Sequence, residues 1–269
     1  MTYCVGMLLE SGFVLMSDTR TNSGVDNVSV FRKMFHWSVP GERIICAMSA
    51  GNLATTQAVV SQLEERNKAP AERDNSLLSA PTMFQVASMI GQLQRDTIRA
   101  TRESNKDKSK SFSSSMIVAG QIAGMEPRLF LIYPEGNFIE ASFDTPFFQI
   151  GETKYGRPII IRAYESDMSF EDAVKLLMVS FDSTLKANLS VGLPLDLMVV
   201  KRDTYEPLHE RRVEASDPYL REISSGWGEA LKRTFYGLPD YSFNLSDEGD
   251  PKHAEGKLRP GTEGATDVR

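Results

Sequence analysis

The sequence has little cysteine, little histidine and no excess of positive charge. Two cysteines occur in 269 residues, Cys4 and Cys46, and each lies within an apolar run, so we expect buried free thiols. The three histidines lack metal-ligand spacing, and the HExxH, GxSxG and P-loop patterns do not occur. We therefore expect no metal and no cofactor. A net charge of −6 does not favour a nucleic-acid partner, because phosphate binding depends on clustered lysine and arginine.

Long hydrophobic runs are also missing. The first residues show no basic segment followed by an apolar one, and no stretch is long enough to span a bilayer. We therefore expect a cytoplasmic protein with no membrane partner. The composition, 41% hydrophobic and 25% charged, is typical of a globular protein with a sizeable core.

The chain is expected to form one domain followed by a tail. No linker rich in Pro, Gly or Ser interrupts residues 2–243, and this domain would include a C-terminal helical extension. From residue 244 to residue 269 the sequence has almost no large apolar residue. Such a composition predicts a disordered tail.

Strand patterns and helix patterns occur in separate blocks. Strands are expected at residues 2–10, 13–17, 30–39, 43–49, 113–121, 128–133, 138–142 and 195–201. Helices are expected at residues 52–67, 82–103, 159–164, 169–188 and 217–236. Because strands are segregated from helices, the order predicts an α+β fold in which two packed sheets are covered by helix pairs, a four-layer αββα sandwich.

The first candidate for chemistry is the residue after the initiator methionine. A threonine at this position permits removal of Met1, which would leave a hydroxyl and a free α-amine together on Thr2. An α-amine has a pKa of about 7.7 to 8.0, so it can accept a proton near neutral pH and activate the hydroxyl. Many proteins begin with Met-Thr and use neither group. This position alone therefore leaves both interpretations open.

Residues 2–53 resemble the start of a proteasome β-type subunit. The shared features are an N-terminal threonine, an Asp-x-Arg-x-x-x-Gly run, a lysine and a later glycine, which are Thr2, Asp18, Arg20, Gly24, Lys33 and Gly51. The later segment NLSVGLP, at residues 188–194, is similar to that of the bacterial proteasome-type family called Anbu. The resemblance extends over roughly residues 2–240.

This resemblance implies an N-terminal nucleophile (Ntn) hydrolase. Thr2 would be the nucleophile, and the positive charge of Lys33 would lower the proton affinity of its hydroxyl. Asp18 would hold Lys33, and the backbone N–H of Gly51 would form the oxyanion hole. Without the resemblance, Asp18 and Lys33 would be interpreted as a surface ion pair, and Gly51 as a helix-entry turn.

The resemblance also implies a substrate site. A peptide would bind in extended form beside Thr21 and Asn22, and Ser49 and Leu53 would line the pocket for the side chain before the scissile bond. Ser190 aligns with the second auxiliary serine of the family. Typical proteasome subunits have Gly-Ser-Gly and Asp-x-x-Ser-Gly around the α-amine, where this sequence has GET at 151–153 and NLSVG at 188–192.

The implied function is a threonine-type endopeptidase that cleaves peptide bonds through an acyl-enzyme on Thr2. A homo-oligomer is implied as well, in a closed ring or an open helical stack. Two alternatives remain: an oligomeric peptide-binding assembly with little or no hydrolysis, and a narrow amidase. The need for an unfoldase partner is left open. The run HERR at residues 209–212 is interpreted as an exposed charge cluster.

Overall fold

The computed structural model describes residues 2–22, 28–68, 76–104 and 111–242. The chain divides into two compact units, one up to Gly228 and one from Glu229 onward. The predicted tail at 244–269 lies outside the described residues. No helix in the described part of the chain is long and apolar enough to cross a membrane.

The first unit contains two five-stranded antiparallel sheets. One sheet has the order β10-β1-β2-β11-β12, with bounds Phe147–Gly151, Tyr3–Leu9, Gly12–Asp18, Leu195–Lys201 and His209–Val213. The other has the order β5-β6-β7-β8-β9, with bounds Met34–Val39, Arg43–Gly51, Ser114–Ile122, Arg128–Ile132 and Phe138–Glu140. A separate two-stranded ribbon pairs β3 (Arg20–Asn22) with β4 (Val28–Val30).

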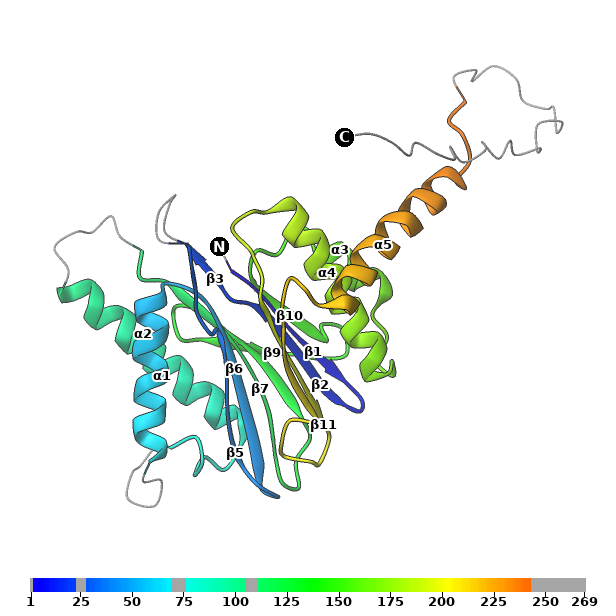
Figure 1. The fold of residues 1–269 in the computed structure, drawn as a ribbon. Helices are drawn as coiled ribbons and strands as arrows, with labels where there is room; N and C mark the ends of the chain where they lie inside the picture. Colours follow the sequence, from blue (N-terminus) through cyan, green and yellow to red (C-terminus); the bar gives the residue numbers. More distant parts are fainter. Residues whose placement is uncertain (1, 23–27, 69–75, 105–110, 243–269) are drawn as a thin grey trace. The chain divides into compact units, whose positions relative to one another are not determined.

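Helix pairs cover the outer faces of both sheets (Figure 1). The pair on one side is α1 (Leu53–Asn67) and α2 (Met83–Ser104), and the pair on the other is α3 (Arg157–Ala163) and α4 (Phe170–Ala187). The last helix, α5 (Pro218–Tyr236), begins in the first unit. The predicted four-layer αββα sandwich is therefore confirmed, and the fold is proteasome-β-like.

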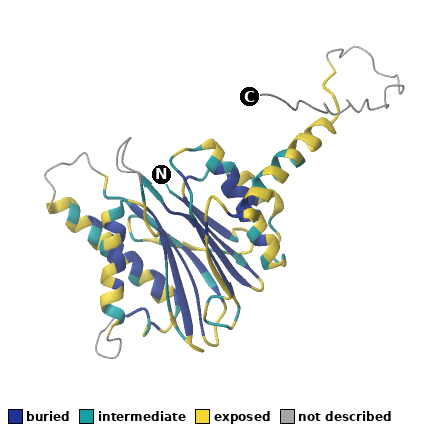
Figure 2. Cartoon of the chain, in the orientation of Figure 1, coloured by how far each residue is buried: buried dark blue, intermediate teal, exposed yellow. Residues whose placement is uncertain are grey.

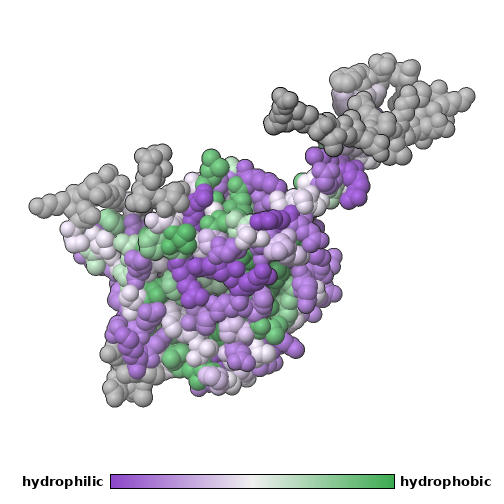
Figure 3. All heavy atoms as spheres, in the orientation of Figure 1, coloured by the Kyte–Doolittle hydropathy of each residue, from purple (hydrophilic) through white to green (hydrophobic). Residues whose placement is uncertain are grey.

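Three apolar layers hold the sandwich together, because both faces of each sheet are covered. Along β1, Tyr3 and Val5 point to the α3 and α4 side, whereas Cys4 between them points into the space between the sheets. A third cluster lies between the other sheet and the helices α1 and α2. The central strands β1, β2, β6, β7 and β11 are almost wholly buried, and the outer helix faces are exposed (Figure 2). The face seen in Figure 3 is mainly hydrophilic, with smaller hydrophobic patches.

The starts of α1 and α4 follow the capping rules. The side chain of Asn52 accepts from the Thr55 N–H at 3.1 Å, and the side chain of Ser169 accepts from the Asp172 N–H at 3.1 Å. These two residues are the first of the helices predicted at 52–67 and 169–188. The two cysteines are buried and free, as predicted.

The sequence prediction is wrong in four places along the strands. The strand expected at 30–39 is interrupted at Phe31, whose N–H donates to the Thr19 carbonyl, and pairing resumes at Met34. Three further strands, β3, β10 and β12, were not expected. The run at 209–212 is exposed as predicted, but it forms β12. Its polar residues carry no apolar alternation, and pairing with β11 overrides their low strand propensity.

Candidate active site at the start of the first strand

Thr2 immediately precedes β1, and its main chain is fixed on two sides. Its carbonyl accepts from the Glu152 N–H at 2.7 Å, and the N–H of the next residue, Tyr3, donates to Asp18 Oδ1 at 2.9 Å. Gly151 has a φ of +84°, and a Cβ added there would lie 2.0 Å from the Thr2 carbonyl oxygen. Only glycine permits this close approach.

Asp18 and Lys33 form a buried ion pair beside Thr2. Lys33 Nζ lies 2.7 Å from Asp18 Oδ1, and the two side chains are 6% and 0% exposed. The same ammonium donates to the Arg20 carbonyl at 2.5 Å. Burial raises the pKa of the Asp18 carboxyl, and the Lys33 ammonium opposes that rise. The simpler interpretation from sequence, a surface ion pair, is therefore wrong.

The turn between α4 and β11 contacts Asp18 of this pair and the neighbouring Arg20. The Gly192 N–H points at Asp18 Oδ2 at 3.4 Å, and Arg20 Nη1 donates to the Leu189 carbonyl at 2.8 Å. A Cβ added at Gly192 would lie 2.3 Å from Arg20 Nε, so the arginine crosses the turn where a larger residue would clash. Ser190, a predicted site residue, lies in this turn, and its N–H donates to Asn188 Oδ1 at 2.9 Å.

Glu152 connects the same turn to Thr2. Its Oε2 accepts from Asn188 Nδ2 at 2.8 Å, and its Oε1 accepts from the Lys154 N–H at 3.0 Å. The Lys154 N–H is the main reason that the pKa of the Glu152 carboxyl lies below its ordinary value, and the Asn188 amide adds to it. The side chain is thus a carboxylate at neutral pH.

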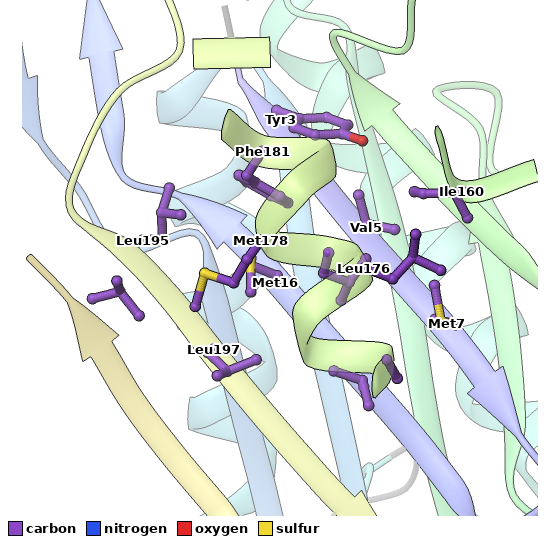
Figure 4. Packing of buried hydrophobic residues seen from close by; sticks show 14 of the residues in the cluster. Tyr3, Val5, Met7, Met16, Ile160, Leu176, Met178, Phe181, Leu195 and Leu197 are labelled. Atoms are coloured by element: carbon purple, nitrogen blue, oxygen red, sulfur yellow. The ribbon is translucent and has the colours of Figure 1, made fainter. Parts of the chain in front are cut away.

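A buried polar network supports β1 from the α4 side. The Tyr3 hydroxyl lies 2.7 Å from Ser180 Oγ and accepts from Gln149 Nε2 at 2.6 Å. Its ring packs on Phe181 with centroids 4.4 Å apart (Figure 4). Burial raises the pKa of Tyr3 to about 12, so the hydroxyl stays protonated. This network fixes the residue that follows Thr2.

The remaining predicted residues lie on neighbouring elements. Gly51 ends β6 with a φ of +119° and is exposed. Ser49 is buried, and its N–H donates to the Lys33 carbonyl at 3.1 Å. Leu53 begins α1, whereas Thr21 and Asn22 belong to β3. Ser49 thus contacts Lys33 of the buried pair directly, and β3 contacts the pair through the Arg20 carbonyl.

Sequence reasoning gave no role to Glu152, Asn188, Tyr3 or Arg20. The signals for the first two were present, because the GET and NLSVG stretches depart from the usual proteasome pattern. Arg20 was part of the Asp-x-Arg run. Nothing in the sequence indicated that the Tyr3 hydroxyl would reach α4, since the partners are distant in sequence.

Comparisons with known proteins agree with this geometry. The profile of the "Proteasome subunit" family matches residues 2–200. The proteasome subunit beta of Methanopyrus kandleri is 26% identical over 216 residues, which are 79% of this chain and 93% of that protein.

Two solved structures are more similar still. Anbu from Yersinia bercovieri, described as an ancestral beta-subunit, has 44% identity and a TM-score of 0.84, and covers 90% of this chain and 100% of its own. The helical assembly of the Anbu complex from Pseudomonas aeruginosa has 42% identity and a TM-score of 0.83, over 90% and 99% of the two chains. The chain therefore belongs to the proteasome subunit family and, within it, to the bacterial proteasome-type Anbu proteins.

Proposed function

We propose that this chain, once Met1 is removed, is an N-terminal threonine hydrolase that cleaves peptide or amide bonds. The observation that carries the proposal is the buried Asp18–Lys33 pair beside Thr2. Burying two charges is costly, and an apolar pair of similar size is often as stable or more stable. A pair held in this place therefore favours a chemical role over a structural one.

The chemistry follows from the groups around Thr2. Oγ1 attacks the substrate carbonyl while its proton passes to the α-amine, and Lys33 stabilises the developing alkoxide. The N–H of Gly51 donates to the oxyanion. The C–N bond then breaks, the proton passes to the leaving amine, and an ester remains on Thr2. Water hydrolyses this ester with the same amine as base and restores the hydroxyl.

The substrate in this proposal is a peptide or unfolded protein segment. It would extend beside β3, at Thr21 and Asn22, and place a side chain near Ser49 and Leu53. Two buried free thiols fit a reducing compartment such as the cytoplasm. The helical assembly of the Pseudomonas aeruginosa relative supports a homo-oligomer, and an open helical stack more than a closed ring.

A second candidate function is an oligomeric assembly that binds peptides with little hydrolysis. The observation that favours it is the hydrogen bond between Asn188 and Glu152, because these residues belong to the NLSVG and GET stretches that depart from the usual proteasome pattern. A narrow amidase would share the Thr2 chemistry. Loss of the Thr2 hydroxyl abolishes turnover by either hydrolase and leaves binding intact.

The experiment is intact-mass analysis after incubation with a peptide epoxyketone. This reagent closes a ring only on a residue that has both a hydroxyl and a free α-amine. We expect a mass without Met1 and with one adduct per chain. Thr2→Ala should remain unlabelled and Thr2→Ser labelled. Retention of Met1 would overturn the proposal, and a processed chain that forms no adduct would favour the binding assembly.

A further inference from the structure

Glu152 lies opposite Thr2, one residue beyond the paired ends of β10 and β1. The antiparallel register of β1 and β10 pairs Tyr3 with Gly151, so the next pair outward is Thr2 with Glu152. The hydrogen bond from the Glu152 N–H to the Thr2 carbonyl, at 2.7 Å, confirms this pairing. Directly opposite residues have Cβ atoms about 4.5 to 5.5 Å apart. Glu152 is therefore a neighbour of the amine that Met1 removal exposes.

The Glu152 carboxylate is held in one orientation by neutral groups. The Asn188 amide and the Lys154 N–H each donate to one of its oxygens. Asn188 is itself oriented, because its own oxygen accepts from the Ser190 N–H at 2.9 Å. Glu152 is only 6% exposed. A nearly buried carboxylate whose hydrogen-bond donors are neutral is stabilised strongly by a nearby cation. Its two oxygens can accept further hydrogen bonds.

Most other charges near Thr2 already have partners. These charged groups, on the elements around the start of β1, are Asp18, Arg20, Lys33, Lys154, Asp182 and Lys186. The exposed Lys154 acts on Glu152 itself, because its positive charge contributes to the lowered pKa of that carboxyl. Asp18 lies 2.7 Å from the ammonium of Lys33, and Asp182 lies 2.8 Å from that of Lys186. Arg20 donates to a backbone carbonyl. The Glu152 carboxylate is thus the acidic group placed to receive the α-ammonium of Thr2.

We propose that Glu152 binds the α-ammonium group of Thr2 and that Asn188 orients the carboxylate for this contact. The inference rests on the proposed function, in which Met1 is removed. Glu152 acts here as a positioning residue, because it fixes the amine that serves as base. A carboxylate beside an ammonium favours the protonated form. The amine is then neutral in a smaller fraction of molecules at neutral pH, and turnover moves to higher pH.

The test measures the titration of the Thr2 amine directly, with or without turnover. Protein that begins at Thr2 is produced by cleavage of an N-terminal fusion and labelled with ¹³C at threonine methyl groups. The Thr2 methyl signal, assigned with Thr2→Ser, is followed against pH. In Glu152→Gln we expect its midpoint to fall by about one pH unit. Asn188→Ala should lower it less. Glu206→Gln, an exposed carboxylate in the β11–β12 loop, should leave it unchanged.

The same variants are then compared in epoxyketone capture across pH. In Glu152→Gln the acid limb of the pH–rate profile should move to lower pH together with the pKa of the Thr2 amine. The capture rate at pH 6.5 should therefore rise by up to about tenfold. A purely structural role would lower the rate at every pH and leave the midpoint in place. An unchanged midpoint in both Glu152→Gln and Asn188→Ala would overturn this inference alone. Retention of Met1 in the natural protein would instead overturn the proposed function.

Discussion

The two ends of the first sheet use the same kinds of charged residue in opposite ways. At the Thr2 end, Asp18 and Lys33 form an ion pair that is almost wholly buried. At the other end, beside the β1–β2 turn, Arg202 pairs with Glu126, and the two side chains are 37% and 73% exposed. An exposed pair contributes little to stability but costs little to form. The buried pair at the Thr2 end therefore agrees with the chemical role proposed for it, whereas the exposed pair requires no such role.

The largest expected effect comes from removing the buried cation. Lys33→Met should slow epoxyketone capture by about 10²- to 10³-fold, because the Thr2 hydroxyl loses the charge that lowers its pKa. It should also lower the free energy of unfolding by about 3 to 5 kcal/mol, since Asp18 is left buried and unpaired. Capture rates and urea unfolding measure the two effects.

A double variant separates these two effects. Asp18→Asn with Lys33→Met removes both charges and should recover much of the lost stability without recovering capture. Recovery of both would contradict the role of Lys33 in activating Thr2.

The next effect tests the close contact at Gly151. Gly151→Ala should destabilise the protein by about 1 to 3 kcal/mol, because its φ of +84° is strained for alanine and the new Cβ meets the Thr2 carbonyl. Displacement of Thr2 by about 1 Å should slow capture by about 10²-fold.

The matched control is Gly124→Ala. Gly124 also has a positive φ, of +77°, but a Cβ there meets nothing within 4 Å. It should lose stability through backbone strain alone and keep its capture rate. Equal loss of capture in both variants would show that Thr2 is not held through Gly151.

A smaller effect compares two tyrosine hydroxyls at opposite ends of β1. Tyr3→Phe leaves Ser180 and Gln149 without their buried partner, so the free energy of unfolding should fall by about 1 to 3 kcal/mol. Tyr164 donates to the Leu8 carbonyl at 2.6 Å in a half-buried position, and Tyr164→Phe should cost about 1 kcal/mol. Thermal and urea unfolding measure both. A larger loss in the free energy of unfolding for Tyr164→Phe than for Tyr3→Phe would contradict this expectation.

The smallest effect belongs to the exposed pair. Arg202→Met should change the free energy of unfolding by less than about 1 kcal/mol and leave capture unchanged, because solvent and salt screen this charge. Urea unfolding at two salt concentrations checks this expectation. A loss as large as that of Lys33→Met would remove the distinction between the two ends.

The layers of the fold were predictable because they depend on local patterns. The strand and helix patterns of the sequence place most strands and helices correctly. β12 was missed because its polar residues form a strand only through pairing with β11. The interruption at Phe31 depends on a hydrogen bond to Thr19, which sequence periodicity does not show.

The sequence proposed residues for the candidate site, and the structure supplied their geometry. Thr2 was a candidate from its position, and Asp18 and Lys33 came from the family resemblance, whereas the burial of the ion pair came only from the structure. Glu152 and Asn188 stood out as departures from the usual pattern. Their contact joins segments 36 residues apart, which one sequence does not reveal.

The most direct test is a crystal structure of the epoxyketone-treated protein. We expect Thr2 to be the first residue, with the reagent bonded to both its Oγ1 and its α-nitrogen and the new hydroxyl oxygen facing the Gly51 N–H. That result would show nucleophile and base on one residue beside the buried Asp18–Lys33 pair. Met1 still attached to Thr2, or a reagent bonded to another residue, would contradict the assignment of Thr2 as the nucleophile.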